Sequence, residues 1–366
     1  MTADKPPYRI PTVAEIGELA GTTGLVAAST FAGCGGSSTG YRWAGYEVRW
    51  ASEYLDAPAN SYAANWPTTI LDRRDVREVP GSDILDAIGV ERGELDLFDG
   101  SPPCQPFSMA GKRDKNWRRD IAHGDGTVNL GGSEDLVREW VRLVKELQPR
   151  AAVMENVKGL TVGKAKGYLL DVMDAVRLLG YRVETRLLDG QWLGVPQRRV
   201  RTIVVAVRDD VGEPAWPEPL PYRYSIRDAC PWIVEADIRL WGKHHDPLEV
   251  DAPMPTVVAT GAQQNRPRVW VENTEVGGFG NVATIDPMTD PAPTITASGN
   301  GTNRVRSTSA EGGRRFTIAE VRRLCGFPDD YTLTGGYVEQ WARLGNSVPP
   351  PMSRAIGEAL APVLAR

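Results

Sequence analysis

The sequence predicts an α/β fold in which helices cover both faces of a mostly parallel sheet, together with a smaller domain of β or irregular structure. Strand-like and helix-like segments alternate over roughly the first 205 residues, and this style returns near the C-terminus. Between them, prolines become frequent and short β-type runs replace helical periodicity. We therefore expect an N-terminal extension over 1–23, a main domain over 24–207 and 314–366, and the smaller domain over 208–313.

The expected elements follow from the spacing of apolar residues. A buried apolar run predicts a strand over 25–31, further strand-like segments cover 47–52, 95–99 and 151–154, and the segments 182–188 and 201–207 are β-rich. Apolar residues three or four positions apart predict helices over 57–65, 135–147, about 167–179, 318–326 and near the C-terminus. The similar segments 255–261 and 293–299 predict a pair of hairpin-like units in the smaller domain.

Composition excludes several classes of protein. No apolar run approaches the roughly 20 residues that a membrane span needs, and the N-terminus lacks the apolar core of a signal peptide. The four cysteines show no C-x-x-C spacing, which disfavours a zinc site or a disulfide scaffold and indicates a reducing cytoplasm. With only three histidines, we expect no metal. The net charge of −5 disfavours a basic footprint over the whole surface but allows local basic clusters.

A lone thiol, Cys104, follows two prolines at the end of the strand-like segment 95–99. A cysteine fixed on a rigid turn at the carboxyl end of a strand is a candidate nucleophile. Taken alone, a buried structural cysteine fits the run equally well. The next segment, 105–132, has no clear periodicity and carries basic residues and glycines, so we expect it to be a mobile lid.

A glycine-rich turn follows the first predicted strand, in the run Phe31-Ala-Gly-Cys-Gly-Gly-Ser-Ser-Thr-Gly-Tyr41. Such a turn lets a ligand approach the backbone, although a plain tight turn is an equal alternative. Its spacing is not G-x-G-x-x-G, because position 38 is serine, so binding of a dinucleotide pyrophosphate is disfavoured. Glu53 and Asp75, each an ordinary surface acid if taken singly, follow later strands. As a series they predict an adenosine-containing cofactor.

Two further runs carry charged side chains at strand ends. Met154-Glu-Asn-Val157 places a carboxylate at the end of a core strand, where it could give a proton to a ring nitrogen or simply cap a helix. Gln197-Arg-Arg-Val-Arg201 offers guanidinium groups suited to carbonyl or phosphate oxygens.

The order of these motifs resembles the DNA (cytosine-5) methyltransferases, which use S-adenosylmethionine. The matching runs are the Phe-Ala-Gly-x-Gly-Gly loop, Pro-Pro-Cys-Gln, Glu-Asn-Val, Gln-x-Arg-x-Arg, Arg323–Asp329 and Gly345–Pro350. They cover about 24–207 and 315–366 and leave the middle largely unmatched. Cys325 stands where the family often has Gln, with little expected effect. The resemblance implies a Rossmann-like methyltransferase fold with a target-recognition domain over 208–313, and a final helix packed beside the first strand.

The resemblance also implies roles for single residues. Cys104 would add to C6 of cytosine, Glu155 would engage N3 and the exocyclic amine, and Asn156 would hold the Pro-Cys turn. Arg199 would contact the base or support the catalytic loop, with Arg201 beside it. The cofactor residues would be Phe31, Gly33, Gly35, Glu53 for the ribose, Asp75 for the adenine, and Asn346 and Ser347 for the methionine end.

Double-stranded DNA is the implied partner, with positive charge gathered in the cleft. The candidate contacts are Lys112, Arg113, Arg118, Arg266 and Arg304. We expect a monomer in the cytoplasm of a bacterium, associated with the nucleoid, or a phage-encoded enzyme; a cognate restriction endonuclease is a candidate partner. The recognition sequence and the presence of that endonuclease do not follow from the chain.

Three alternatives stay open. A tRNA cytosine-5 methyltransferase of the same fold would carry a Cys-Phe-Thr motif in the middle region, and this chain has none. A catalytically silent protein that binds cofactor and DNA is disfavoured by the intact Cys104, Glu155 and Arg199. Transfer of a modified group from an altered cofactor is not excluded by the sequence.

Overall fold

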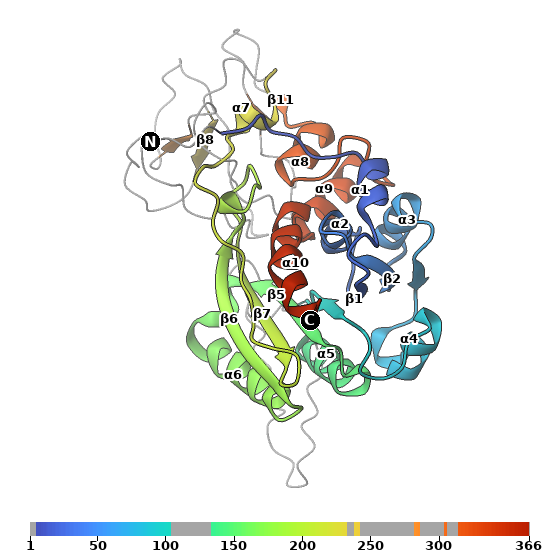
Figure 1. Cartoon of the computed structure of the whole chain (residues 1–366). Coiled ribbons are helices and arrows are strands. Elements are labelled where there is room, and N and C mark those ends of the chain that lie inside the picture. Colours follow the sequence, from blue (N-terminus) through green and yellow to red (C-terminus); the bar gives the residue numbers. More distant parts are fainter. Residues whose placement is uncertain are drawn as a thin grey trace.

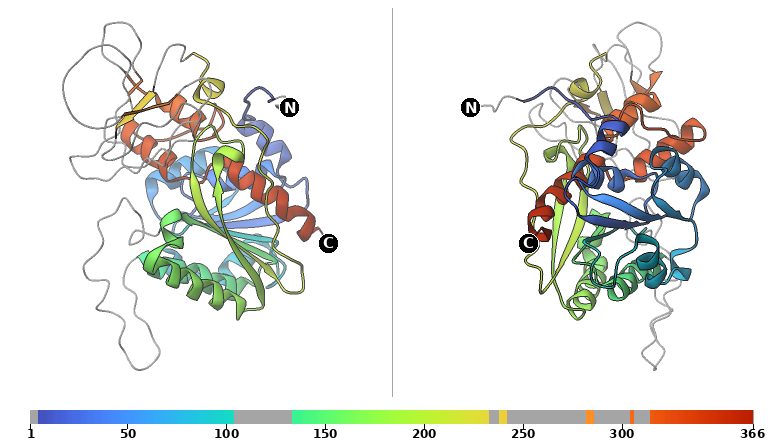
Figure 2. Two further views of the ribbon diagram at one scale, coloured as in Figure 1. Left: turned by 90° about the vertical axis from the view of Figure 1, so that its left-hand side faces the viewer. Right: turned by 45° about the vertical axis from the view of Figure 1, so that its right-hand side comes forward.

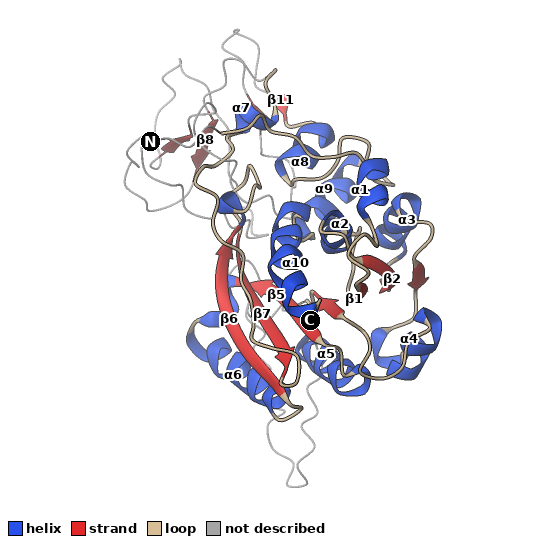
Figure 3. Cartoon of the chain, in the orientation of Figure 1, coloured by secondary structure: helices blue, strands red, loops and turns tan. Residues whose placement is uncertain are grey.

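A computed structural model describes residues 5–103, 133–232, 238–241, 282–285, 304–305 and 314–365 (Figure 1). Its main feature is a seven-stranded sheet with helices on both faces, which Figure 3 shows by colour. The predicted α/β class is confirmed. Cys104 and the predicted lid over 105–132 lie outside the described residues.

Most predicted elements are present, with bounds shifted by a few residues. The described chain begins with α1 (Val13–Leu19), which lies in the predicted N-terminal extension, and continues with β1 (Val26–Thr30), α2 (Gly36–Trp43), β2 (Glu47–Ser52), α3 (Asp56–Asn65), β3 (Ile70–Asp72), η1 (Val76–Glu78), α4 (Gly81–Ile88) and β4 (Leu97–Gly100). It continues with α5 (Ser133–Leu147), β5 (Ala151–Val157), η3 (Lys158–Thr161), α6 (Gly163–Arg177), β6 (Tyr181–Asp189), η4 (Gly190–Trp192) and β7 (Val200–Arg208). After α7 (Ile226–Ala229), the C-terminal return supplies α8 (Ile318–Leu324), α9 (Tyr337–Asn346) and α10 (Pro350–Leu364).

The sheet has the strand order β3-β2-β1-β4-β5-β7-β6. The pairs from β3 through β5 are parallel, whereas β7 runs antiparallel to both β5 and β6. The carboxyl ends of β1, β2, β4 and β5 therefore meet at one edge. Ligands of open α/β sheets bind outside that edge.

The two faces of the sheet bury alternate residues of the same strands. Phe98 of β4 and Met154 of β5 pack under α4, α5 and α6, where Trp140 is fully buried. Leu97 and Val153, one position away, face α2 and α10 instead. Runs that are apolar at every position are what a strand buried on both faces requires. Figure 2 shows α10 in red and α5 and α6 in green on opposite sides of the sheet.

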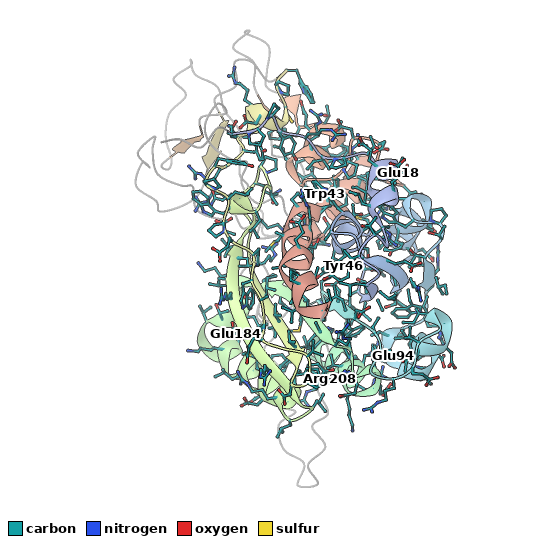
Figure 4. The ribbon with its side chains drawn as sticks, in the orientation of Figure 1. Glu18, Trp43, Tyr46, Glu94, Glu184 and Arg208 are labelled. Carbon is teal, nitrogen blue, oxygen red and sulfur yellow. The ribbon has the colours of Figure 1, made fainter. Side chains whose placement is uncertain are left out.

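The C-terminal return packs against the start of the chain, as the resemblance implied. A side chain at Gly36, the first residue of α2, would place its Cβ only 2.2 Å from the Val348 carbonyl oxygen, so glycine permits this close approach. Tyr46, labelled in Figure 4, donates a hydrogen bond of 2.9 Å to the Gly357 carbonyl of α10. Arg354 lies over the ring of Trp43 at 4.4 Å. The C-terminal segment thus packs against α2 and the residues that follow it, although more than 300 residues separate them in sequence.

The middle of the chain is described only in short pieces. Strand β8 (Ile238–Trp241) pairs antiparallel with β9 (Val282–Ile285), and β10 (Arg304–Val305) pairs antiparallel with β11 (Arg314–Arg315). The similar segments 255–261 and 293–299 lie outside the described residues, so the hairpin-like units and the bounds of a target-recognition domain stay predictions. Within the described part of the chain, every helix is too short or too polar to cross a lipid bilayer.

Candidate active site

The glycine-rich turn between β1 and α2 has an unusual backbone. Phe31 adopts a positive φ of 54°, which is uncommon for a residue with a side chain, and Gly33 follows at 56°. The Ala32 amide donates to the Ser52 carbonyl of β2 at 2.9 Å, which ties the turn to the neighbouring strand. No atom lies within 4 Å of where a Cβ of Gly33 would be. The backbone at Gly33 is therefore open to a ligand.

Glu53 follows β2 and closes the turn from the side. Its carboxylate accepts hydrogen bonds from the Gly33 amide at 2.9 Å and from the Leu55 amide at 2.8 Å. Burial raises the pKa of Glu53, and the two amides oppose that shift. A carboxylate oxygen can accept more than one hydrogen bond, so both oxygens retain capacity for a ligand.

Asp75 follows β3 and caps η1. It accepts hydrogen bonds from the Arg77 amide at 3.0 Å and from the Arg77 guanidinium at 2.9 and 2.5 Å. These contacts lower the pKa of Asp75. Any further donor at this carboxylate must share it with Arg77.

The turn that leads to Cys104 is held by two hydrogen bonds to neighbouring segments. Asn156, in β5, donates to the Pro102 carbonyl at 3.1 Å. Ser101 donates to the Phe31 carbonyl at 3.1 Å. The turn is therefore fixed directly against β5 and the glycine-rich loop.

Glu155 and Arg201 form a largely buried ion pair. The Arg201 Nε lies 2.9 Å from the Glu155 Oε1, and each side chain is little more than a tenth exposed. Burial lowers the pKa of Arg201, and the Glu155 carboxylate opposes this shift. The pair brings a carboxyl group and a cation together at the end of β5.

Arg199 has different partners from Arg201. It is buried, and its guanidinium donates to the carbonyls of Gly345 at 3.0 Å and Ser347 at 2.7 Å. Burial, reinforced by the charge of Arg201, lowers the pKa of Arg199 to about 9. The side chain still carries its charge at neutral pH.

One cavity of about 780 Å³ connects these groups. It is lined by most of the predicted site residues: Phe31, Gly33, Glu53, Asp75, Glu155, Asn156, Arg199, Arg201, Asn346 and Ser347. Gly35 instead packs against Tyr62 and Tyr331, where a Cβ would lie 2.6 Å from the Tyr331 hydroxyl, so it shapes the turn from behind.

The predicted DNA contacts Lys112, Arg113, Arg118 and Arg266 lie outside the described residues, as does Cys104. Arg304 is described only through the backbone of β10. Within the described part of the chain, no cluster of three or more His, Cys, Asp and Glu side chains is arranged to hold a metal ion.

Several lining residues were not predicted. Tyr54, Leu55 and Arg77 lie within two residues of Glu53 or Asp75, so their positions in the sequence could have indicated them. Glu339 and Arg343 come from α9, a helix that the sequence analysis did not identify.

Asp99, at the end of β4, is a buried carboxyl group behind this cavity. It accepts hydrogen bonds from Ser29 of β1 at 2.8 Å and from the Tyr41 hydroxyl of α2 at 3.2 Å. Burial raises the pKa of Asp99 to about 6; Ser37, Ser29 and Tyr41 oppose the shift, and the charge of Glu155 adds to it. The carboxyl group links β4 to β1 and to α2.

This raised pKa predicts a pH-dependent stability. Between the unfolded pKa near 4 and the folded pKa near 6, the folded state retains a proton that the unfolded state has lost. Stability should therefore fall as pH rises through this window, by up to about 3 kcal/mol. We expect the free energy of unfolding of the wild type, minus that of Asp99→Asn, to fall between pH 4 and 7 in denaturant titrations. A difference that stays constant with pH would show that Asp99 does not titrate in this way.

Comparison with known proteins identifies the family. The model of the C-5 cytosine-specific DNA methylase family matches residues 26–361. The Type II methyltransferase M.XorII of Xanthomonas oryzae pv. oryzae is 29% identical over 364 residues, spanning 89% of this chain and 82% of that protein. The Type II methyltransferase M1.HphI of Haemophilus parahaemolyticus is 28% identical over 336 residues, spanning 90% and 85%.

Solved structures agree on the fold. A structure described as a DNA modification methyltransferase encoded within an E. coli prophage aligns with a TM-score of 0.62 at 22% identity, covering 93% of this chain and all of the other. The Dnmt2 methyltransferase of S. pombe aligns with a TM-score of 0.58 at 17% identity, covering 93% and 98%. The family match extends from β1 into α10 and includes every strand of the seven-stranded sheet. The chain belongs to the C-5 cytosine-specific DNA methylase family.

Proposed function

We propose that the chain transfers a methyl group from S-adenosylmethionine to C5 of a cytosine flipped out of a specific duplex DNA sequence, through a covalent bond between Cys104 and C6. One observation carries the proposal. The acid that would hold the cofactor and the ion pair that would hold the base line the same cavity, at the edge where β1, β2, β4 and β5 end.

The residues present fit S-adenosylmethionine. The open backbone at Gly33 leaves room for the ligand, Glu53 offers carboxylate oxygens to ribose hydroxyls, and Asp75 would accept from the adenine amine. Asn346 and Ser347 would face the methionine end. When bound, the cofactor supplies an electrophilic methyl group on a sulfonium sulfur.

Cys104 would make the base reactive. Its thiolate forms a bond to C6, and the electron pair of the C5–C6 double bond moves toward N3, which takes a proton; C5 thereby becomes nucleophilic. After C5 has taken the methyl group, the C5 proton leaves to water and the S–C6 bond breaks. That cleavage returns the electron pair to sulfur, and loss of the N3 proton restores the ring.

Glu155 would provide that proton at N3 and receive it again at the end of the cycle. Arg201, at 2.9 Å, would keep the carboxyl group aimed at the base and present its remaining donors to the ring carbonyl. Asn156 would keep the preceding turn, and with it the thiol, in register.

Reaching C5 and C6 requires flipping of the base, because both atoms are stacked inside a duplex. Flipping costs a few kcal/mol, which protein contacts must offset. We propose that Lys112, Arg113, Arg118, Arg266 and Arg304 supply phosphate contacts, that 105–132 closes over the base, and that 208–313 reads the target sequence.

The relatives named Type II methyltransferases favour a role in a restriction-modification system. We propose that the chain acts as a monomer in a bacterial cytoplasm and protects host DNA from a cognate endonuclease.

Glu53→Gln tests the cofactor site. The glutamine side chain has only one acceptor oxygen, so it cannot accept from both the Gly33 and the Leu55 backbone N–H groups at its two ends. The turn therefore loses a charge-assisted hydrogen bond, and the ribose loses an acceptor. We expect the Kd for S-adenosylmethionine to rise by roughly tenfold to a hundredfold in calorimetric titrations. Asp56→Asn, an exposed change three residues away, is the control. A Kd that stays unchanged in Glu53→Gln would remove Glu53 from the cofactor site.

Transfer of a tritiated methyl group onto duplex DNA and onto tRNA, assayed side by side, tests the function itself. We expect label in cytosine of DNA and none in tRNA. Label in tRNA alone would replace the proposal by an RNA-directed activity.

A further inference from the structure

The guanidinium of Arg199 holds one short segment of the C-terminal part of the chain. Its two terminal nitrogens donate to the carbonyls of Gly345 and Ser347, the residues on either side of Asn346. The backbone of Arg199 is itself fixed, because its amide donates to the Asp189 side chain at 3.2 Å and its carbonyl accepts from the Gly190 amide at 3.1 Å. The backbone from which the Arg199 side chain extends is therefore held in place on both sides.

The segment it holds is the carboxyl end of α9. Gly345 lies in the last turn and Ser347 is the C-cap, so their carbonyls have no partner within the helix. A buried cation is favourable at this end of a helix. Directly beyond, Val348 approaches the first turn of α2 at Gly36, next to the glycine-rich loop. Asn346 and Ser347 line the same cavity as Gly33 and Glu53, and the Ser347 Cβ lies 3.2 Å from the position that a Cβ at Gly36 would take.

Arg201 lines the same cavity but has a different partner. It lies two residues further along, in β7, and pairs with the Glu155 carboxylate rather than with the C-terminal segment. The two arginines of the Gln-x-Arg-x-Arg run thus contact different parts of the site.

We infer that Arg199 is a positioning residue for the cofactor, holding Asn346 and Ser347 against the glycine-rich loop, whereas Arg201 acts on the base. This division of labour rests on the proposed function. It replaces a direct contact between Arg199 and cytosine with an indirect role through the backbone of 345–347.

A matched pair of variants, Arg199→Lys and Arg201→Lys, tests the inference. Both keep the positive charge and remove the planar fork that lets one side chain hold two oxygens. S-adenosylmethionine and S-adenosylhomocysteine are titrated into each full-length variant without DNA, and KM and kcat for methyl transfer are measured on duplex DNA. Circular dichroism and thermal denaturation establish that each variant is folded.

For Arg199→Lys we expect the Kd of both ligands and the KM for S-adenosylmethionine to rise about tenfold, with kcat at saturating cofactor close to wild type. For Arg201→Lys we expect an unchanged Kd and a reduced kcat. Unchanged Kd values in Arg199→Lys, or equal changes in both variants, would overturn the inference. So would failure of Arg199→Lys to fold, because a role confined to one loop leaves the sheet intact. If the wild type bound neither ligand, the proposed function would fail instead, since this assay needs no methylation.

Discussion

Replacing Cys104 by serine is expected to lower the rate of methyl transfer by roughly 10⁴-fold or more, because a serine hydroxyl is not ionised near neutral pH and cannot replace the thiolate. The Kd for S-adenosylmethionine should stay unchanged, because the cavity residues that would hold the cofactor come from other parts of the chain. Initial rates on duplex DNA and calorimetric titration of the cofactor give the two values.

Cys230→Ser is the matched control for that experiment. Cys230 is fully buried at the end of α7 and is not among the residues that line the cavity, so its replacement should affect stability and leave the rate per folded molecule unchanged. A Cys104→Ser enzyme that still methylates would refute the covalent mechanism. Loss of cofactor binding in that variant would instead assign Cys104 a structural role.

Replacing Glu155 by glutamine is expected to reduce kcat by about 10²-fold to 10⁴-fold, because an amide can hydrogen-bond to N3 but cannot transfer a proton to it. The Kd for S-adenosylmethionine should not change. The variant also leaves Arg201 without its buried partner, which costs about 3–5 kcal/mol of stability. Rates are therefore compared at temperatures well below the thermal transition of the variant.

The Glu53→Gln variant is compared with Glu155→Gln for both cofactor affinity and kcat. It should weaken cofactor binding at nearly constant kcat under saturating cofactor, which is the opposite pattern from Glu155→Gln. A Glu155→Gln enzyme with the kcat of the wild type would show that the N3 proton comes from elsewhere.

The strands were the most predictable part of the fold. Residues 151–154 are apolar at every position because alternate side chains meet helices on opposite faces of the sheet. Helix α9 was missed, because it is a short helix that follows a glycine pair and was not recognised from its apolar spacing. The antiparallel direction of β7 follows from its short connection to β6, which the sequence analysis did not weigh.

Candidate site residues could be predicted where their position relative to a strand end is visible in the sequence. Glu53 directly follows β2, Glu155 and Asn156 lie near the carboxyl end of β5, and all three line the cavity. The partners of Arg199 could not be predicted, because Gly345 and Ser347 lie more than 140 residues away and reach it only through the return of the chain. The ion pair between Asp75 and Arg77 could not be predicted either, because it depends on the turn conformation at η1.

The central claim, methylation of DNA at C5 of cytosine, is tested most directly by sequencing the methylome of a bacterial host that lacks endogenous cytosine methylation and expresses this chain. We predict 5-methylcytosine at one position of a fixed sequence context throughout the genome, and its absence from a host expressing Cys104→Ser. Unmodified DNA, or methylation at N4 of cytosine or N6 of adenine, would contradict the account.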